Sequence, residues 1–204
     1  MITIIDYGLG NVGAFANLYK RMNLPTRFAR TASDLEQAER IVLPGVGAFD
    51  HAMDLLDASG MRPNLERRVM EDGVPIVGVC VGMQMLADGS DEGSRQGLGW
   101  IPGRVRHFSH SSAARDLPMP HMGWNDVRPQ PDQPLFRSLE TDARFYFLHS
   151  FYFECEAEQD VAARSQYGLD FACAVRKGHI QGVQFHPEKS HHFGSNLLKN
   201  FAEA

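Results

Sequence analysis

The sequence predicts an α/β fold, a three-layer sandwich in which helices cover both faces of a mostly parallel central sheet. Three short apolar runs lead to this prediction: "MITIID" (1–6), "RIVLPG" (40–45) and "PIVGVC" (75–80). A helical pattern follows each run, and strands that alternate with helices are typical of a parallel sheet. The runs show little apolar–polar alternation, as expected for strands buried on both faces.

The elements of the first half follow in order along the chain. After the strand 1–6, a helix over 11–22 would carry one apolar stripe made of Val12, Phe15, Ala16, Tyr19 and Met22. "TRFAR" is predicted to be extended, and Ser33 is predicted to cap a helix in "SDLEQAER". Strand 40–45 should be stopped by Pro44 and Gly45, helices should occupy 48–58 and 62–72, and strand 75–80 should lead into a helix beginning "VGMQMLAD".

The second half is richer in strands. "WIPGRVRHF", "ARFYFLHSFYF" and "HIQGVQFHP" are predicted to be extended. "RPQPDQP" and residues 109–120 are predicted to be surface loops because their composition is irregular or rich in proline. With 204 residues and no internal repeat, the chain is expected to form one domain over 1–204.

Composition excludes several classes of function. The net charge is −5, which disfavours a nucleic-acid surface, since phosphates attract an excess of Lys and Arg. The first residues are expected to form a strand and not a signal peptide, and no apolar run approaches the roughly 18 residues of a membrane span. Three cysteines lie far apart without a C-x-x-C, which suits reduced thiols in the cytoplasm.

The first motif is a glycine pattern near the start, "DYGLGNVG". It satisfies G-x-G-x-x-G at Gly8, Gly10 and Gly13, the pattern of a dinucleotide-binding turn. That use also requires an acid at the end of the second strand, and "TRFAR" supplies none. Asp34 is the nearest acid and lies in the predicted helix start. A tight strand–helix turn is therefore the favoured interpretation, and nicotinamide binding the alternative.

The second motif is "GVCVGMQ", where Cys80 lies between Gly78 and Gly82. A strand, then G-x-C-x-G, then a helix is the layout of a nucleophile elbow. Side chains at the flanking positions would collide with the neighbouring strand and helix, so glycines are needed there. The turn also places the thiol at a helix N-terminus, which favours the thiolate that attacks. The alternative is a small apolar cysteine at a strand end.

A nucleophilic cysteine needs a base, and "GVQFHPEKS" offers His186 with Glu188 to orient it. Two residues apart in an extended run, the two side chains would point to the same face. Cys80 and His186 both follow strands, and sites gather at the carboxyl ends of parallel strands. The alternative is a metal site that would add His191 and His192, but neither C-x-x-C nor H-E-x-x-H is present.

Other motifs are weaker by themselves. "PGVGAF" leaves the backbone N–H groups around Val46 approachable, as an oxyanion hole requires, although an ordinary turn would look the same. Residues alone favour core positions for Trp124, for His149 and for the aromatic stripe "FYFLHSFYF".

Taken together, these motifs resemble one family. "PGVGAF", "GVCVGMQ", "HMGWN", "FYFLHSF" and "GVQFHPEKS" occur in the order and spacing of class I, triad-type glutamine amidotransferases. Within that class, "HMGWN" combined with "HPEKS" is similar to the glutaminase subunits of imidazole glycerol phosphate synthases, from histidine biosynthesis. The resemblance covers essentially the whole chain, from "DYGLGN" to "LLKNF".

The resemblance implies a role for each matching residue. Cys80 would attack the carboxamide of glutamine, His186 would shuttle protons, and Glu188 would orient His186. The backbone N–H groups of Val46 and Val81 would form the oxyanion hole; the family more often has Leu at the latter position, but the role is a backbone one. Further residues would bind glutamine: Gly47, Gln84, His149, Ser150 and Phe151.

The resemblance also implies a partner, a separate (β/α)₈ cyclase subunit in a heterodimer. Four positions would face it around an ammonia passage: Asn11, Trp124, Tyr146 and Lys189. No metal and no cofactor is expected. Three rivals stay open: a paralogous amidotransferase subunit for surface amino-sugar synthesis, a nucleotide-binding oxidoreductase, and a non-catalytic interaction module.

Overall fold

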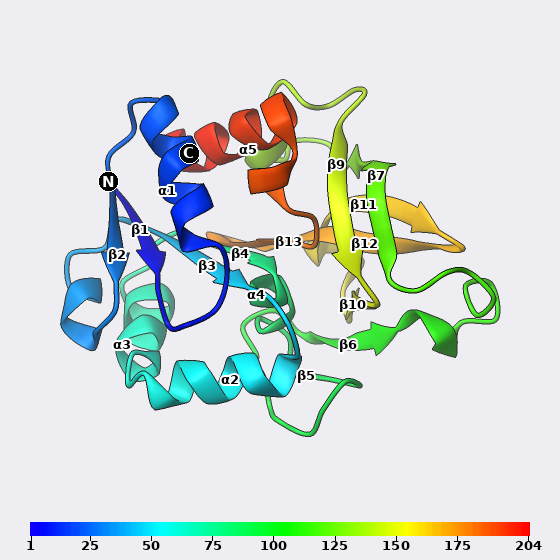
Figure 1. The fold of residues 1–204 in the computed structure, drawn as a ribbon, viewed down its shortest axis with the longest axis horizontal. Coiled ribbons are helices and arrows are strands. Elements are labelled where there is room, and N and C mark those ends of the chain that lie inside the picture. Colours follow the sequence, from blue (N-terminus) through cyan, green and yellow to red (C-terminus); the bar gives the residue numbers. More distant parts are fainter.

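A parallel sheet forms the middle of the molecule in the computed structural model, which describes residues 1–204 (Figure 1). Its neighbouring strands, in spatial order, are β2 (Thr26–Ala29), β1 (Ile2–Ile5), β3 (Arg40–Gly45), β4 (Ile76–Cys80) and β13 (Ile180–Val183). All residues of β1, β4 and β13 are buried, as their apolar sequences predict. The predicted α/β fold on a parallel sheet is confirmed.

Antiparallel strands extend this sheet beyond β13. They are β12 (Leu169–Lys177), β10 (Phe151–Cys155) and β6 (Gly103–His107). β11 (Val161–Tyr167) also pairs with β12, and β8 (Arg128–Pro129) pairs with β11. β5 (Gly89–Ser90) pairs in parallel with β6 at the edge. β11 and β12 were not predicted, because their alanines, serine and charged residues give little strand signal.

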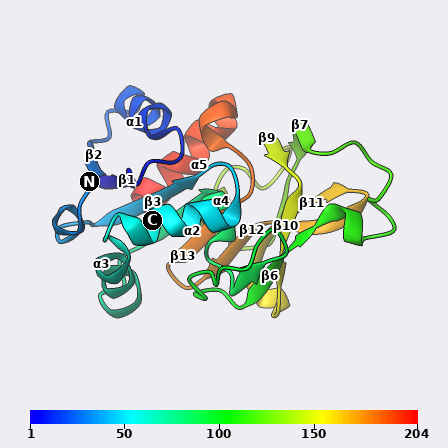
Figure 2. The ribbon, with the colours of Figure 1, turned by 60° about the horizontal axis from the view of Figure 1, so that its bottom comes forward.

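Helices cover both faces of the sheet. α1 (Val12–Arg21) and α5 (His191–Glu203) lie on one face, whereas α2 (Phe49–Ala58) and α3 (Arg62–Glu66) lie on the other (Figures 1 and 2). α4 (Val81–Gln84) is a single turn after β4, shorter than its sequence suggested. The remaining helical turns are η1 (Ala32–Leu35), η2 (Arg67–Glu71), η3 (Phe108–His110), η4 (Pro134–Phe136), η5 (Glu158–Asp160) and η6 (Pro187–Lys189).

A second, two-stranded sheet pairs β7 (His121–Asp126) with β9 (Arg144–His149) in antiparallel register. β9 was predicted, whereas β7 was not. The buried aromatic rings of β9 belong to the aromatic core, where Phe145 stacks on Phe185 with 3.9 Å between ring centroids. His186 N also donates a hydrogen bond to Tyr146 O at 2.9 Å. The small sheet is thereby joined to the end of β13.

Two local predictions were wrong. Thr31, not Ser33, caps the turn η1, because the Asp34 carboxylate reaches back to the backbone N–H groups of Arg30 and Thr31 at 2.9 and 2.8 Å. β3 ends at Gly45 as predicted, with Pro44 paired to Val79 and Gly45 to Cys80 of β4. The last strand ends at Val183, so His186 and Glu188 do not lie in a strand.

Candidate active site

The turn at Cys80 has the geometry of a nucleophile elbow. Cys80 is the last residue of β4 and has φ 58° and ψ −114°, a backbone conformation with positive φ that residues other than glycine rarely adopt. A Cβ at Gly78 would lie 2.4 Å from the carbonyl oxygen of Gly82, and one at Gly82 would lie 2.0 Å from that of Leu43. The glycines that the sequence singled out are therefore sterically required.

His186 and Glu188 form a buried pair beside this elbow. Their Nδ1 and Oε1 atoms are 2.8 Å apart, and their side chains are 5% and 4% exposed. The contact is made within the turn η6, not by alternate residues of a strand as the sequence suggested. Burial disfavours the charged imidazole, but hydrogen bonds with Cys80 and Glu188 outweigh it and raise the pKa of His186 to about 9. His186 is thus protonated near neutral pH and able to balance a thiolate.

A pocket of about 290 Å³ opens over Cys80. It collects segments that are far apart in the sequence, and its lining comprises Val46, Gly47, Cys80, Val81, Gln84, Glu92, Pro120, Leu148, His149, Ser150, Phe151, His186 and Lys189. Every residue expected to act on or bind glutamine is therefore in the lining, except the buried Glu188. Glu92, Pro120 and Leu148 were not expected from the sequence.

Comparison with known proteins agrees with this geometry. Residues 3–204 match the family described as "Glutamine amidotransferase class-I". The chain belongs to the class I glutamine amidotransferases.

Two relatives illustrate how closely the chain follows one branch of these amidotransferases. It is 61% identical over 203 residues to "Imidazole glycerol phosphate synthase subunit HisH" of Bdellovibrio bacteriovorus, covering all of both chains. It is 50% identical to the protein of the same name from Leptospira borgpetersenii, with 99% of each chain covered. A solved structure described as a glutamine amidotransferase superposes with a TM-score of 0.75, covering 100% of this chain and 98% of the other. At 20% identity, this likeness supports the fold and nothing more.

Two residues that the sequence did not point to support the catalytic centre of this amidotransferase. The hydroxyl of Tyr7 donates to the carbonyl oxygen of Pro44 at 2.8 Å, next to the segment 45–47 that holds Val46. Burial, with a smaller effect of Cys80, raises the pKa of Tyr7 and keeps the hydroxyl a donor. Gln184 Nε2 lies 3.8 Å from the sulfur of Cys80, and Gln184 Oε1 accepts from Gln84 Nε2 at 3.0 Å.

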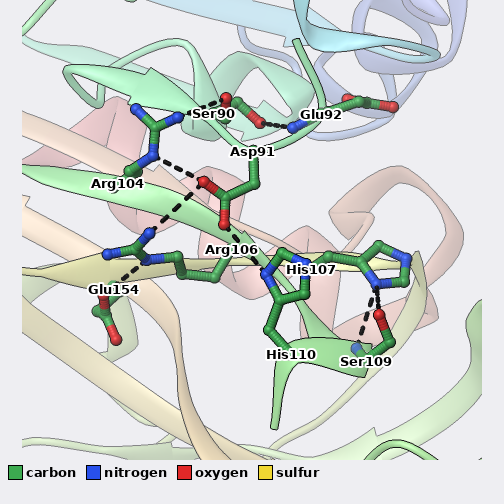
Figure 3. A network of polar contacts seen from close by, with 9 residues as sticks. All are labelled: Ser90, Asp91, Glu92, Arg104, Arg106, His107, Ser109, His110 and Glu154. Atoms are coloured by element: carbon green, nitrogen blue, oxygen red, sulfur yellow. Dashed lines mark hydrogen bonds and ion pairs between the residues drawn. The ribbon is translucent and has the colours of Figure 1, made fainter.

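The loop that carries Glu92 is held by a network of charges (Figure 3). Asp91 accepts from Arg104 Nε at 2.7 Å and pairs with Arg106 and His110 at 3.5 and 3.3 Å. Its neighbour Glu92 accepts from the backbone N–H of Phe49 at 2.8 Å. Asp91 thus fixes the backbone on one side of Glu92, which lines the pocket.

The residues expected to face a partner lie mostly together. Trp124 and Tyr146 are directly opposite each other on β7 and β9, and Lys189 Nζ lies 5.8 Å from the centre of the Tyr146 ring. Trp124 is 42% exposed and stacks on His191, so the core position that its residue type favoured is wrong. Asn11 is exposed and caps α1, which contacts the turn η6.

The two alternative site types gain no support from the geometry. No three side chains of His, Cys, Asp or Glu come together as metal ligands, and both His191 and His192 are exposed. In the glycine motif near the start, a Cβ at Gly10 would lie 2.7 Å from Cβ of Pro44, so this glycine allows close packing against β3.

No helix is both long enough and apolar enough to span a membrane.

Proposed function

We propose that this chain is the glutaminase subunit of imidazole glycerol phosphate synthase in histidine biosynthesis, with residues 1–204 acting as one unit. It would hydrolyse glutamine to glutamate and pass ammonia to a cyclase subunit, which makes imidazole glycerol phosphate and AICAR. The observation that carries the proposal is the buried His186–Glu188 pair at 2.8 Å beside Cys80 on its strained turn. The full-length match to relatives of that name supports the choice of synthase.

The first half-reaction is acyl transfer. The Cys80 thiolate attacks the carboxamide carbon, a C–S bond forms, and the negative charge that develops on oxygen is stabilised by the N–H groups of Val46 and Val81. His186, protonated because its pKa is raised to about 9, gives its proton to the departing nitrogen. The C–N bond breaks, ammonia leaves, and a glutamyl thioester remains on the cysteine.

The second half-reaction is hydrolysis of the thioester. His186, now neutral, takes a proton from water, and the resulting hydroxide attacks the thioester carbon. The C–S bond breaks and the new γ-carboxylic acid loses its proton to solvent, so that glutamate leaves, while the proton on His186 again balances the thiolate. Glu188 keeps Nδ1 of the imidazole occupied throughout, so that the other ring nitrogen faces the reaction.

Glutamine is recognised at its amino-acid end in this proposal. The backbone of 149–151, Gly47 and the side chain of Gln84 line the pocket and would hold the substrate in place. Glu92 is an additional candidate, since it lines the same pocket and its negative charge would attract the ammonium group of the substrate.

The partner of this subunit would cover an exposed apolar strip. Its members come from β7, β9 and the segment after β3, and include Val46, Met122, Trp124 and Leu148, which are 41%, 65%, 42% and 36% exposed. Burying such residues favours association. A closed interface also serves the chemistry, because ammonia released into water at neutral pH is mostly converted to ammonium, which is not nucleophilic.

Covalent labelling tests the nucleophile. A glutamine analogue that carries an electrophile should label Cys80 and spare the other two cysteines. Burial raises the pKa of Cys155 to about 12 and raises that of the fully buried Cys173 as well, so both stay thiols. Cys80→Ser should keep the fold and lose glutaminase activity in the complex with cyclase. Label on another cysteine, found by peptide mapping, would refute the assignment.

Turnover assays test the partner. We expect slow glutamine hydrolysis by this chain alone, and at least 100-fold faster hydrolysis with cyclase and its nucleotide, which corresponds to about 2.7 kcal/mol. Lys189→Ala should uncouple the two activities, so that glutamine is consumed without matching product, while the matched surface change Lys199→Ala should not. Equal rates for the isolated chain and the liganded complex would contradict gating. A complex that forms no imidazole glycerol phosphate would refute the choice of synthase.

A further inference from the structure

A chain of four polar groups runs from the strand β7 to the wall of the pocket. Asn125 Nδ2 lies 3.1 Å from His121 Nε2, and His121 Nδ1 lies 2.8 Å from His149 Nε2. His149 Nδ1 in turn lies 2.7 Å from the carbonyl oxygen of Phe151. The last link ends on the segment 149–151, whose backbone lines the pocket.

The proton positions along this chain are determined by its two ends. The carbonyl of Phe151 can only accept, so Nδ1 of His149 must carry a hydrogen. Nε2 of a neutral His149 then accepts, which requires a hydrogen on Nδ1 of His121. Nε2 of a neutral His121 accepts in its turn, and the amide of Asn125 is the donor there.

The other end agrees with this order independently. The amide of Asn125 is oriented by two backbone contacts: its Oδ1 accepts from Asp126 N at 2.8 Å, and its Nδ2 donates to Gln166 O at 2.9 Å. The nitrogen therefore faces His121, as the chain requires. Every hydrogen-bonding atom of the amide is used, and no link has two donors or two acceptors facing each other.

The two rings are held neutral and fixed in place. Burial lowers the pKa of His149 to about 3, against a smaller raising effect of the hydrogen bond with Phe151 O, and burial lowers the pKa of His121 to about 4. The ring of His121 stacks between Phe147 and Tyr167, with centroids 4.8 and 4.2 Å away. Stacking and burial therefore favour one orientation and the neutral form of the His121 ring.

We propose that Asn125 and His121 are positioning residues: through His149 they fix the Phe151 carbonyl and thus the backbone that binds the amino-acid end of glutamine. The inference rests on the proposed function, because only that function gives 149–151 a substrate to bind. The hydrogen bonds set the tautomer of both rings, so Nδ1 of His149 always carries the hydrogen that the Phe151 carbonyl accepts. Rings that could exchange tautomers would break this hydrogen bond part of the time and would hold the backbone less firmly. Asn125 and His121 act here without touching the substrate.

Nitrogen-15 NMR of the histidine side chains tests the proton order directly. At pH 7 both His121 and His149 should be neutral with hydrogen on Nδ1, in the free protein and in its complex with cyclase. Either ring with hydrogen on Nε2 alone would overturn the proposal. This measurement needs no turnover, so it stands or falls separately from the glutaminase assay, whose failure in the wild-type complex would refute the proposed function instead.

Substitutions test the effect on substrate binding. His121→Phe keeps a ring between Phe147 and Tyr167 but removes the donor to His149, and the KM for glutamine should rise about fivefold with kcat changed less than twofold. His121→Asn can present an N–H at the Nδ1 position and should restore most of the KM. Tyr167→Phe is the matched control: it loses its hydrogen bond to Pro118 O, outside the chain, and should change neither KM nor the tautomers.

Asn125→Asp provides a second variant that keeps the size of the side chain. Its carboxylate cannot donate, so His121 Nε2 should gain a hydrogen and the ring should carry two N–H signals at pH 7. Unchanged signals in this variant, or an unchanged KM in a folded His121→Phe protein, would overturn the proposal.

Discussion

The two sides of the pocket are built by different forces. On the side of Cys80, backbone atoms touch backbone atoms, and Gly78 and Gly82 leave no room for one more carbon. On the side of 149–151, the backbone is held by side-chain hydrogen bonds that come from His149, His121 and Asn125. Cys80 is thus placed by sterics, whereas the backbone of 149–151, to which we assign substrate binding, is placed by polar groups.

This difference has a physical consequence. Steric contacts do not depend on protonation, so the elbow keeps its geometry at any pH at which the protein is folded. Hydrogen bonds between imidazoles exist only while each ring holds the right proton. The predictions below change one side at a time, from the largest expected effect to the smallest.

The largest effect should come from adding one methyl group on the steric side. Gly82→Ala places a carbon against the Leu43 carbonyl, and we expect a loss of roughly 3 kcal/mol or more of stability, with turnover lowered roughly 100-fold in what still folds. Gly13→Ala is the matched control, since α1 leaves open space there, and it should stabilise by about 0.5–1 kcal/mol. Thermal unfolding and glutaminase assays of both variants check this expectation. If Gly82→Ala melted at the same temperature as the wild type, the turn at Cys80 would be able to adjust to the extra carbon.

The next largest effect should come from the negative charge of Glu188, which contacts His186. Glu188→Gln keeps the shape but removes the negative charge that helps to raise the pKa of His186. A hydrogen bond to a charged group contributes about 1.5–3 kcal/mol, so turnover should fall roughly 10- to 150-fold. Alkylation of Cys80 measured against pH should show a lower imidazole pKa. Glu203→Gln, on the exposed end of α5, is the control and should change neither quantity.

The pH dependence of the free energy of unfolding should distinguish His186, beside Cys80, from His121 and His149, beside the backbone of 149–151. The folded pKa of His186 is about 9, above the ordinary 6.5, so its contribution is complete below pH 6.5 and lost as pH rises to 9. The folded values of His121 and His149 are about 4 and 3, below 6.5, so their contribution is lost as pH falls from 6.5. The slope is about 1.4 kcal/mol per pH unit for each proton.

Urea unfolding of the wild type and two variants checks this expectation. His186→Asn should flatten the alkaline decline only, and His121→Phe the acidic decline only. If both variants changed the same limb, the assignment of the two sides would be wrong.

The smallest effect should come from the network around Glu92. Asp91→Asn keeps an acceptor for Arg104 but removes the charge, and exposed pairs contribute little. We expect the KM for glutamine to rise about threefold without a change in kcat, since only the position of Glu92 is relaxed. Asp170→Asn, which breaks the exposed pair with Arg128, should leave KM alone. A change in kcat would argue for a wider disturbance of the pocket.

Much of the parallel half could be predicted because its signals are local. The runs that became β1, β3 and β4 are apolar over four to six residues, and the glycines around Cys80 mark the turn by themselves. β7, β11 and β12 escaped prediction because their residues have mixed preferences, and their pairing is set by neighbours far away in the chain.

Among the site residues, the sequence identified those that carry a recognisable residue type in a motif. Tyr7, Gln184, Glu92 and the partnership of His121 with His149 were missed, since none of them is unusual in its local context. Tyr7 acts on Pro44 37 residues away, and His121 on His149 28 residues away. Only the order of the strands brings such pairs together.

The sequence by itself therefore determined the backbone constraints: where a turn needs glycine, where a strand is buried, and which residue types can act as nucleophile and base. The tertiary structure decided the partners, namely the contact of Glu188 with His186 through a turn and not a strand, the exposure of Trp124, and the proton order of the imidazole chain. The reason is range. Steric limits on φ and ψ act within a few residues, whereas hydrogen bonds and burial depend on which distant segments the sheet places side by side.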